Sequence, residues 1–265
     1  MTEGILFGIE DGIARMTFNR PEARNAMNAA IIQAMIKFAR EIETNRDVRA
    51  VLINGKGDNF MAGGDVKGMT EVLSESEDVR RANFEQRAVE AGPLFQTLER
   101  MPQPVVVSAR GFSAGVALSF IAGADLTIVS DNAQFLLAHV GIGLCPDGGC
   151  TWHLPRAVGV KKAKELAFFG DRIDAQEALR IGLVTRVVPD AELDAETDKV
   201  LRRLARSPSV SIAQSKHLMN RASSVSLTDQ LLEEGRSLGL CGQSYDVREG
   251  VNAFIEKRKP DFKGR

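Results

Sequence analysis

Cysteine, tryptophan and tyrosine are scarce in this 265-residue chain, which has three cysteines, one tryptophan and one tyrosine. An odd number of unevenly spaced cysteines argues against a disulfide framework and favours a reducing, cytoplasmic location. Cys145 and Cys150 also have no companion histidine or cysteine at metal-ligand spacing, so no metal site is predicted.

The chain also lacks an excess of charge of either sign. Lysine and arginine number 34 against 35 aspartates and glutamates, so nucleic acid and anionic membranes are poor default partners. The longest apolar stretches are interrupted by Ser, Gly or Asp and are too short to span a membrane. No basic region precedes an apolar run at the start, so no signal peptide is predicted. The length suits one large domain, or one core with a small addition.

Short apolar segments alternate with amphipathic ones in the first 190 residues. Residues 5–10 and 13–18 predict a hairpin around Asp11-Gly12, and Asn28 is placed to cap a helix over residues 29–42. The other strands are predicted at residues 50–53, 104–109, 125–129 and 184–188, and the other helices at residues 82–101, 115–122 and from Asp174. Pro93 predicts a kink or a late start in the second helix.

The alternation of strands and helices predicts an α/β core with largely parallel pairing. From Ala191 onward the pattern is helical to the end of the chain. We therefore divide the chain into a core over residues 1–190 and a helical region over residues 191–265.

Two places in this core share one design, in which a strand runs into small residues and a helix begins. They are residues 51–54 with 61–65, and residues 105–109 with 111–115. Helix N-termini expose unpaired amides and the positive end of the helix dipole, and small residues admit a ligand close to the backbone. Two such turns facing each other could bind one oxygen as an oxyanion hole. The same spacing also fits tight turns that bind nothing.

The second turn has a rival interpretation. Residues 111–115 match the G-x-S-x-G pattern of a nucleophile elbow, with Ser113 as the nucleophile. A serine hydrolase needs an acid and a histidine later in the chain, and Asp190 and His217 have the right order. No oxyanion segment of the hydrolase type precedes the turn.

Asp147 lies in the segment LCPDGGCTW at residues 144–152. An aspartate between proline and glycine is commonly a turn residue or a helix N-cap. Apolar neighbours would make its carboxylate a stronger base, whereas a helix starting at Gly148 would keep it ionised. Both interpretations stay open from the residues alone.

Several motifs recur in fixed order along nearly the whole chain. They are NRPEARNAMN at 19–28, FMAGGDVK at 60–67, GFSAGV at 111–116, AGADL at 122–126, GDRIDAQEA at 170–178, GLV at 182–184 and FIEKRKPDF at 254–262. In this order and spacing the chain resembles the crotonase superfamily of enoyl-CoA hydratases and isomerases.

The resemblance implies a core of stacked ββα turns forming a spiral, with a helical C-terminal region that drives assembly into a homotrimer or a dimer of trimers. It implies an acyl-CoA thioester as substrate and no separate cofactor, because coenzyme A is part of the substrate. By position, the oxyanion amides belong to Gly64 and Val116. Many relatives have glycine where this chain has Val116, which adds a Cβ beside the amide. Gly115 is therefore kept as the substitute donor.

The resemblance also bears on the reaction. Hydratases of the family use two glutamates, and their positions are occupied here by Ser119 and His139. Asp147 matches the acidic position of the isomerases, and residues 144–156 look most like the isomerase of ring epoxides in phenylacetyl-CoA breakdown. We expect an acyl-CoA double-bond isomerase in which Asp147 moves the proton. The alternatives are a hydratase, thioester hydrolase, dehalogenase or decarboxylase, or a binding protein with a degraded site.

The resemblance implies coenzyme A contacts along two segments, which Arg24 and Lys67 flank. Both residues are candidates to contact the phosphates of coenzyme A, although both also fit ordinary surface charge. The residues that match the CoA and thioester path of relatives are Ala26, Ala62, Asp65 and Val66. Ser119 and His139 are expected beside the acyl group, and Lys257, Arg258 and Lys259 are candidates to reach the CoA of a neighbouring subunit.

Overall fold

A computed structural model describes residues 3–265, apart from the side chain of Lys67. Its main sheet has six strands in the order β1-β2-β3-β4-β6-β9. They are β1 (Ile5–Glu10), β2 (Ile13–Phe18), β3 (Ala50–Gly55), β4 (Val105–Ala109), β6 (Leu126–Ser130) and β9 (Arg186–Val188). Only β1 and β2 pair antiparallel, as the predicted hairpin, and the other neighbours are parallel. The predicted parallel core is confirmed.

Helices follow most of these strands. They are α1 (Ala29–Thr44), α2 (Glu77–Arg100), α3 (Ala117–Gly123), α4 (Cys150–Val158), α5 (Val160–Phe169) and α6 (Ala175–Arg180). Asn28 caps α1 as predicted, since its side chain accepts from the Ile31 amide at 3.0 Å. The late start at Pro93 is wrong, because α2 begins at Glu77 behind a Ser76 cap and continues through the proline.

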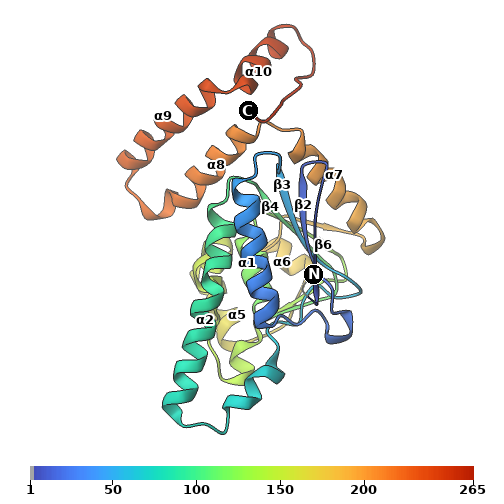
Figure 1. Ribbon diagram of the computed structural model, residues 1–265, viewed down its shortest axis with the longest axis vertical. Helices are drawn as coiled ribbons and strands as arrows, with labels where there is room; N and C mark the ends of the chain where they lie inside the picture. The colour runs from blue at the N-terminus through green and yellow to red at the C-terminus, as the bar shows by residue number, and fades with distance from the viewer. Residues whose placement is uncertain (1–2) are drawn as a thin grey trace.

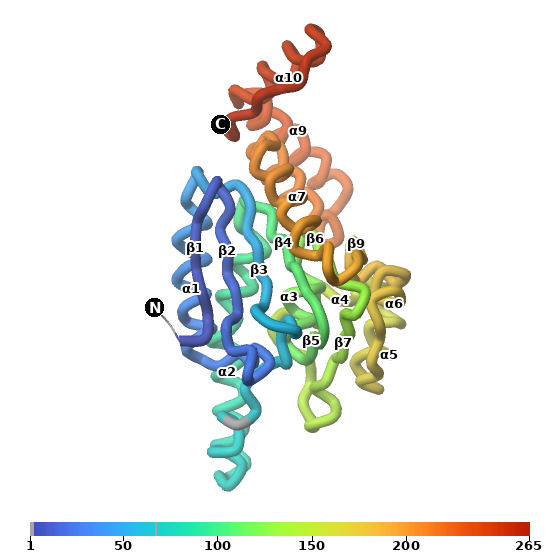
Figure 2. The backbone as a smooth tube through the Cα atoms, turned by 90° about the vertical axis from the view of Figure 1, so that its right-hand side faces the viewer, coloured from blue at the N-terminus to red at the C-terminus, as the bar shows by residue number. Residues whose placement is uncertain are grey.

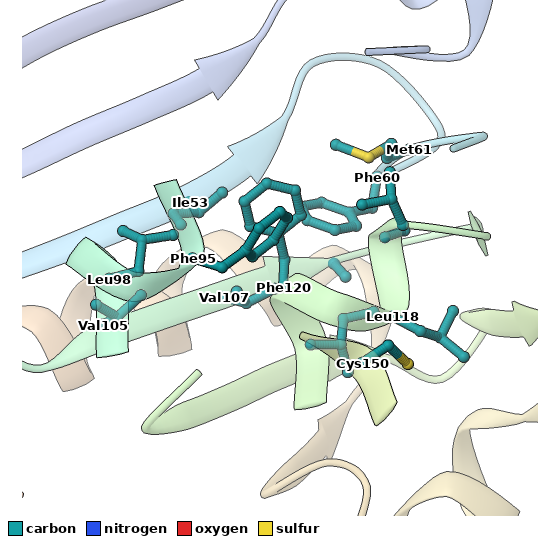
Figure 3. Packing of buried hydrophobic residues seen from close by; sticks show 14 of the residues in the cluster. Ile53, Phe60, Met61, Phe95, Leu98, Val105, Val107, Leu118, Phe120 and Cys150 are labelled. Carbon is teal, nitrogen blue, oxygen red and sulfur yellow. The ribbon is translucent and has the colours of Figure 1, made fainter. Parts of the chain in front are cut away.

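The main sheet is covered by helices on both faces, as Figure 1 shows. On one face, Met16, Ile53 and Val107 join the larger core beneath α1, α2 and α3, part of which is drawn in Figure 3. On the other face, Leu52 and Val106 pack against α7 (Leu193–Ala205). Successive strand residues point to opposite faces, so these near-continuous apolar runs are what a sheet buried on both sides requires.

A second, smaller sheet was not predicted. It consists of β5 (Phe112–Ala114), β7 (Gln134–Leu136) and β8 (Ile173–Asp174), with β5 parallel and β8 antiparallel to β7. Strands of two or three residues are too short to show a period of two. Residues 111–115 therefore do not run directly from one strand into a helix, as predicted, but contain a strand of their own.

The last three helices extend away from the main sheet (Figures 1 and 2). They are α8 (Ser209–Arg221), α9 (Leu227–Gln243) and α10 (Tyr245–Ile255). Helix to the end of the chain is wrong after Ile255, because Lys257 takes a φ of 55° and the tail returns to Asp246 through the Lys263 and Gly264 amides. Within residues 3–265, no helix combines the length and apolar content needed to cross a membrane.

A buried ion pair attaches these helices to the core. The Lys216 ammonium on α8 lies 2.7 Å from the Asp125 carboxylate and also donates to the carbonyls of Leu98 and Gln103, at 3.0 and 3.1 Å. The Lys216 side chain is only 6% exposed. Three acceptors satisfy the three donors of this buried ammonium, which makes the charge tolerable inside the protein.

We expect Lys216→Met to lower the free energy of unfolding by about 3 kcal/mol, since removing one partner of a buried pair leaves the other charge uncompensated. Urea denaturation measures this loss. Lys199→Met is the matched control, because Lys199 pairs with Glu196 on the surface and its side chain is 73% exposed. Equal stability of the two variants would contradict a docking role for Lys216.

Candidate active site

Two segments that are distant in sequence pair through their backbones at the end of the main sheet. The Met27 amide donates to the Gly63 carbonyl at 2.8 Å, and the Ala62 amide donates to the Arg24 carbonyl at 2.8 Å. The Asp65 amide then donates to the Met27 carbonyl at 2.9 Å. The predicted CoA-path residues around 24–27 and 62–65 are therefore brought together.

The same segment pairs on its other side with β5. The Ala114 amide donates to the Met61 carbonyl at 2.9 Å, so residues 61–63 lie between the first segment and the second turn. A side chain at Gly63, whose φ is 103°, would place its Cβ 3.1 Å from the Ala114 carbonyl oxygen and 3.7 Å from the Gly115 Cα. The two predicted turns touch, and only glycine allows this approach.

The amides of the two turns differ in whether they donate a hydrogen bond within the protein. In the described part of the chain, no group accepts from the amides of Gly64 or Val116. The Gly115 amide, in contrast, donates to the Leu136 carbonyl at 3.0 Å. Gly115 is therefore wrong as a substitute donor, whereas Val116 stands at the N-cap of α3 with its amide available.

Asn25, which the sequence reading missed, holds the first segment in place. It is 1% exposed, takes a φ of 57°, and its side chain accepts from the Arg20 amide and donates to the carbonyls of Lys56 and Asn59. A buried asparagine that uses its whole amide group fixes a turn firmly. The signal in the sequence was the place of Asn25 within the motif NRPEARNAMN at residues 19–28.

Asp147 lies on the loop before α4, which begins at Cys150 and not at the predicted Gly148. Its side chain is 47% exposed, which contradicts one of the two interpretations left open, that of a carboxylate in partly dry surroundings. The carboxylate Oδ1 lies 3.5 Å from Nε2 of His139. The structure therefore places two of the predicted site residues side by side.

Ser119 supports the backbone of that loop. Its hydroxyl donates to the Asp147 carbonyl oxygen at 2.9 Å, and the residue is 1% exposed. The Cys150 amide donates to the same carbonyl at 3.0 Å. The expected role of Ser119 as an open hydroxyl beside the acyl group is thus replaced by a structural one, because its proton is engaged inside the protein.

The described residues proposed for coenzyme A are exposed or half-buried. Arg24 is exposed and holds a left-handed turn with a φ of 47°. Val66 is also exposed, whereas Asp65 forms an ion pair of 3.3 Å with Arg20, which in turn donates to the Ala26 carbonyl. The predicted contact of the Lys67 side chain lies outside the described residues.

The three C-terminal basic residues are all exposed, and Arg258 is in ion pairs. Arg258 is paired with Glu249 and Glu256, and these contacts raise the pKa of its guanidinium. Lys257 adopts a left-handed turn and Lys259 is exposed after α10. Their expected contact with a neighbouring CoA stays a prediction.

The structure contradicts the serine hydrolase. Ser113 lies inside strand β5 with no exposed surface, and its hydroxyl has no partner among the described residues. His217 is on α8, where it contacts Glu233 of α9 at 3.3 Å, and Asp190 pairs with Arg110. A nucleophile elbow needs an exposed hydroxyl beside a histidine, and neither condition holds.

The structure is thus an α/β fold in which two turns touch, each with an amide that has no acceptor among the described residues. The model of the enoyl-CoA hydratase/isomerase family matches residues 8–265. A probable enoyl-CoA hydratase of Rhodobacter capsulatus is 38% identical over 98% of this chain and 98% of its own. The 1,2-epoxyphenylacetyl-CoA isomerase of Escherichia coli is 33% identical over 100% of both chains.

A solved structure agrees with these relatives. The crystal structure of an enoyl-CoA hydratase from a Polaromonas species has a TM-score of 0.88 at 30% identity, covering 98% of this chain and 99% of that one. The chain belongs to the enoyl-CoA hydratase/isomerase family, and its predicted crotonase fold with a helical C-terminal region is confirmed. The relatives include a hydratase and an isomerase, so the reaction must be inferred from the side chains of the site.

The two cysteines that flank Asp147 provide a test of this loop. Cys145 is exposed, whereas burial raises the pKa of the Cys150 thiol to about 12, with a smaller opposing effect of the hydrogen bond to Ser119. Because the thiolate is the reactive form, iodoacetamide at pH 8 should alkylate Cys145 well before Cys150. Mass spectrometry of timed digests measures both rates. Labelling of Cys150 in the native protein at the rate of Cys145 would contradict the described loop.

Proposed function

We propose that this enzyme is an acyl-CoA double-bond isomerase. The observation that supports it best is the arrangement of the three side chains at positions 119, 139 and 147. Ser119 is buried and bonded to a backbone carbonyl, and Asp147 is the one carboxylate of the three. Isomerisation needs a single group that removes a proton and returns it elsewhere, so one carboxylate suffices.

The thioester would be bound by the free amides. In this proposal the Gly64 and Val116 amides donate to the thioester oxygen, which gains negative charge when a proton leaves the carbon chain. The two donors then stabilise the enolate-like transition state more than the ground state. Asp147 takes the proton from one carbon and returns it two carbons away.

The acyl-CoA substrate follows from the family. The Rhodobacter and Escherichia relatives are named for enoyl-CoA and epoxyphenylacetyl-CoA. Exposed Arg24 lies at the edge of the paired segments, where a phosphate could meet it from solvent. We infer that CoA binds along residues 24–27 and 62–66, with its thioester toward Gly64.

Hydration is the second candidate, and one contact favours it. Adding water across a double bond needs one group to activate water and another to deliver a proton. His139 and Asp147 lie 3.5 Å apart and could divide those tasks. A 3-enoyl-CoA and a 2-enoyl-CoA offered separately distinguish the reactions, because hydration destroys the conjugated enoyl absorbance while isomerisation of the first creates it.

Assembly is part of the proposal. Helices α9 and α10 carry exposed apolar side chains, among them Leu238, Val251 and Phe254, which are 75%, 53% and 86% exposed. An apolar surface of this kind marks an interface. We infer that these helices form the interface of the expected trimer, alone or as a pair of trimers. The expected cytoplasmic location is a separate part of the proposal.

Replacing Asp147 by asparagine tests the assigned base. Asp147→Asn should lower kcat for double-bond isomerisation by at least about 100-fold, since the amide cannot accept the proton. The dissociation constant of the acyl-CoA should change little, because the amides still bind the thioester. Asp11→Asn, in the exposed turn between β1 and β2, is the control. Retained turnover in Asp147→Asn would remove this residue from the mechanism.

The amide hydrogen of Val116, the second proposed oxyanion donor, can be removed separately from the effect of its side chain. Val116 has a φ of −61°, which proline adopts, and proline is tolerated where a helix begins. Val116→Pro deletes the amide hydrogen and should lower kcat by about 100- to 1000-fold. Val116→Ala keeps the donor and should retain activity. Circular dichroism of both variants checks the fold, and full activity of a folded proline variant would exclude this donor.

A further inference from the structure

The carboxylate of Asp147 has little around it to fix its direction. Its side chain is 47% exposed, and in the part of the chain that the structure describes only His139 comes within ion-pair distance of it. The hydrogen bonds of Ser119 and Cys150 hold the Asp147 backbone carbonyl and not its carboxylate. A base that must reach two carbons of one substrate needs a defined orientation.

His139, in contrast, is held on several sides. Its side chain is 11% exposed, and its backbone carbonyl accepts from the Leu144 amide at 3.0 Å. A Cβ placed on Gly115 would lie 3.9 Å from Cε1 and 4.0 Å from Nε2 of the ring. The imidazole therefore lies between the second turn at residues 111–115, directly before Val116, and the loop of Asp147.

The two ring nitrogens of His139 have different surroundings. Nδ1 is buried and has no hydrogen-bond partner among the described residues, whereas Nε2 faces Asp147 at 3.5 Å. A proton on Nδ1 would leave a buried donor without an acceptor, which is costly. In the neutral imidazole the one proton is then on Nε2, where a carboxylate can accept it.

We propose that His139 is the positioning residue of Asp147, acting through an Nε2–H donor that holds the carboxylate toward the acyl carbons. The distance of 3.5 Å is long for a hydrogen bond, and catalytic contacts of this kind commonly shorten when substrate binds. The inference rests on the proposed role of Asp147, and it gives the histidine at a hydratase glutamate position a task that involves no proton transfer to substrate.

The experiment compares variants at position 139 with a 3-enoyl-CoA as the probe. His139→Leu removes the donor and should lower kcat about 10- to 100-fold with KM little changed, the effect of one hydrogen bond to a charged group. His139→Gln carries an amide nitrogen near the position of Nε2 and should recover most of kcat. His139→Asn carries its amide near the position of Nδ1 and should not recover it.

Two comparisons separate positioning from a general effect on folding. In an Asp147→Asn background, His139→Leu should cause no further loss, because there is no carboxylate left to orient. His217→Leu is the matched control, since His217 also contacts a carboxylate, that of Glu233, at 3.3 Å and lies outside the site. Should His139→Leu prove unstable on heating, the Gln and Asn variants still give the decisive contrast.

Three results would overturn the inference: full kcat in a folded His139→Leu variant, a Gln variant no better than Asn, or losses that multiply in the double variant. The last two would indicate that the imidazole itself exchanges protons, as hydration requires. Turnover by Asp147→Asn alone would instead overturn the proposed function. An inactive Asp147→Asn beside an active His139→Leu leaves the proposed function standing and rejects only the positioning role.

Discussion

The candidate site depends on the backbone pairing of residues 61–65 with two neighbours at once. Met61 and Ala114 are joined on one side, and Gly63 and Met27 on the other, by hydrogen bonds of 2.8 to 2.9 Å. Such ladder bonds consume every second amide of an extended segment and leave those between them pointing away. The Gly64 amide is free because its neighbours Gly63 and Asp65 bond to Met27.

The loop that carries Asp147 is likewise fixed by contacts of its backbone. The Ser119 hydroxyl of α3 and the Cys150 amide of α4 both donate to the Asp147 carbonyl in the loop before α4. A side chain on Gly148, which has a φ of 58°, would meet the Phe95 ring at 2.8 Å and the Ser119 hydroxyl at 3.1 Å. Helix α2, helix α3 and this loop therefore meet at a position that only glycine can fill, and the backbone at Asp147 is fixed by this packing.

The sequence predicted those parts of the fold whose residues signal their own structure. Asn28 as a cap, the turn at Asp11-Gly12 and the apolar strands all depend on local chemistry and were found where expected. The short second sheet was missed because its strands exist only through pairing with each other. Pro93 misled because tertiary packing of α2 outweighs the hydrogen bond that proline removes.

The site divides in the same way. The resemblance to the family brought Gly64, Val116, His139 and Asp147 together as candidates, and the backbone contacts join the segments that carry them. Which amide is free could not be read from the chain, because the competing acceptor of Gly115 is Leu136 on a strand that was not predicted. The engagement of Ser119 was equally hidden, since it requires knowing that α3 faces the loop before α4.

Main-chain hydrogen bonds and the choice of side chains play separate parts in the proposed site. Bonds between main-chain atoms fix the free amides of Gly64 and Val116, and such bonds survive most changes of side chain. In the proposed mechanism the proton is moved by a side chain at one of positions 119, 139 and 147, and Ser119 is bonded inward here, which leaves Asp147 with His139 beside it. Under this proposal, stabilising an enolate is a property of the backbone, whereas the fate of the enolate depends on which side chain can exchange a proton with it.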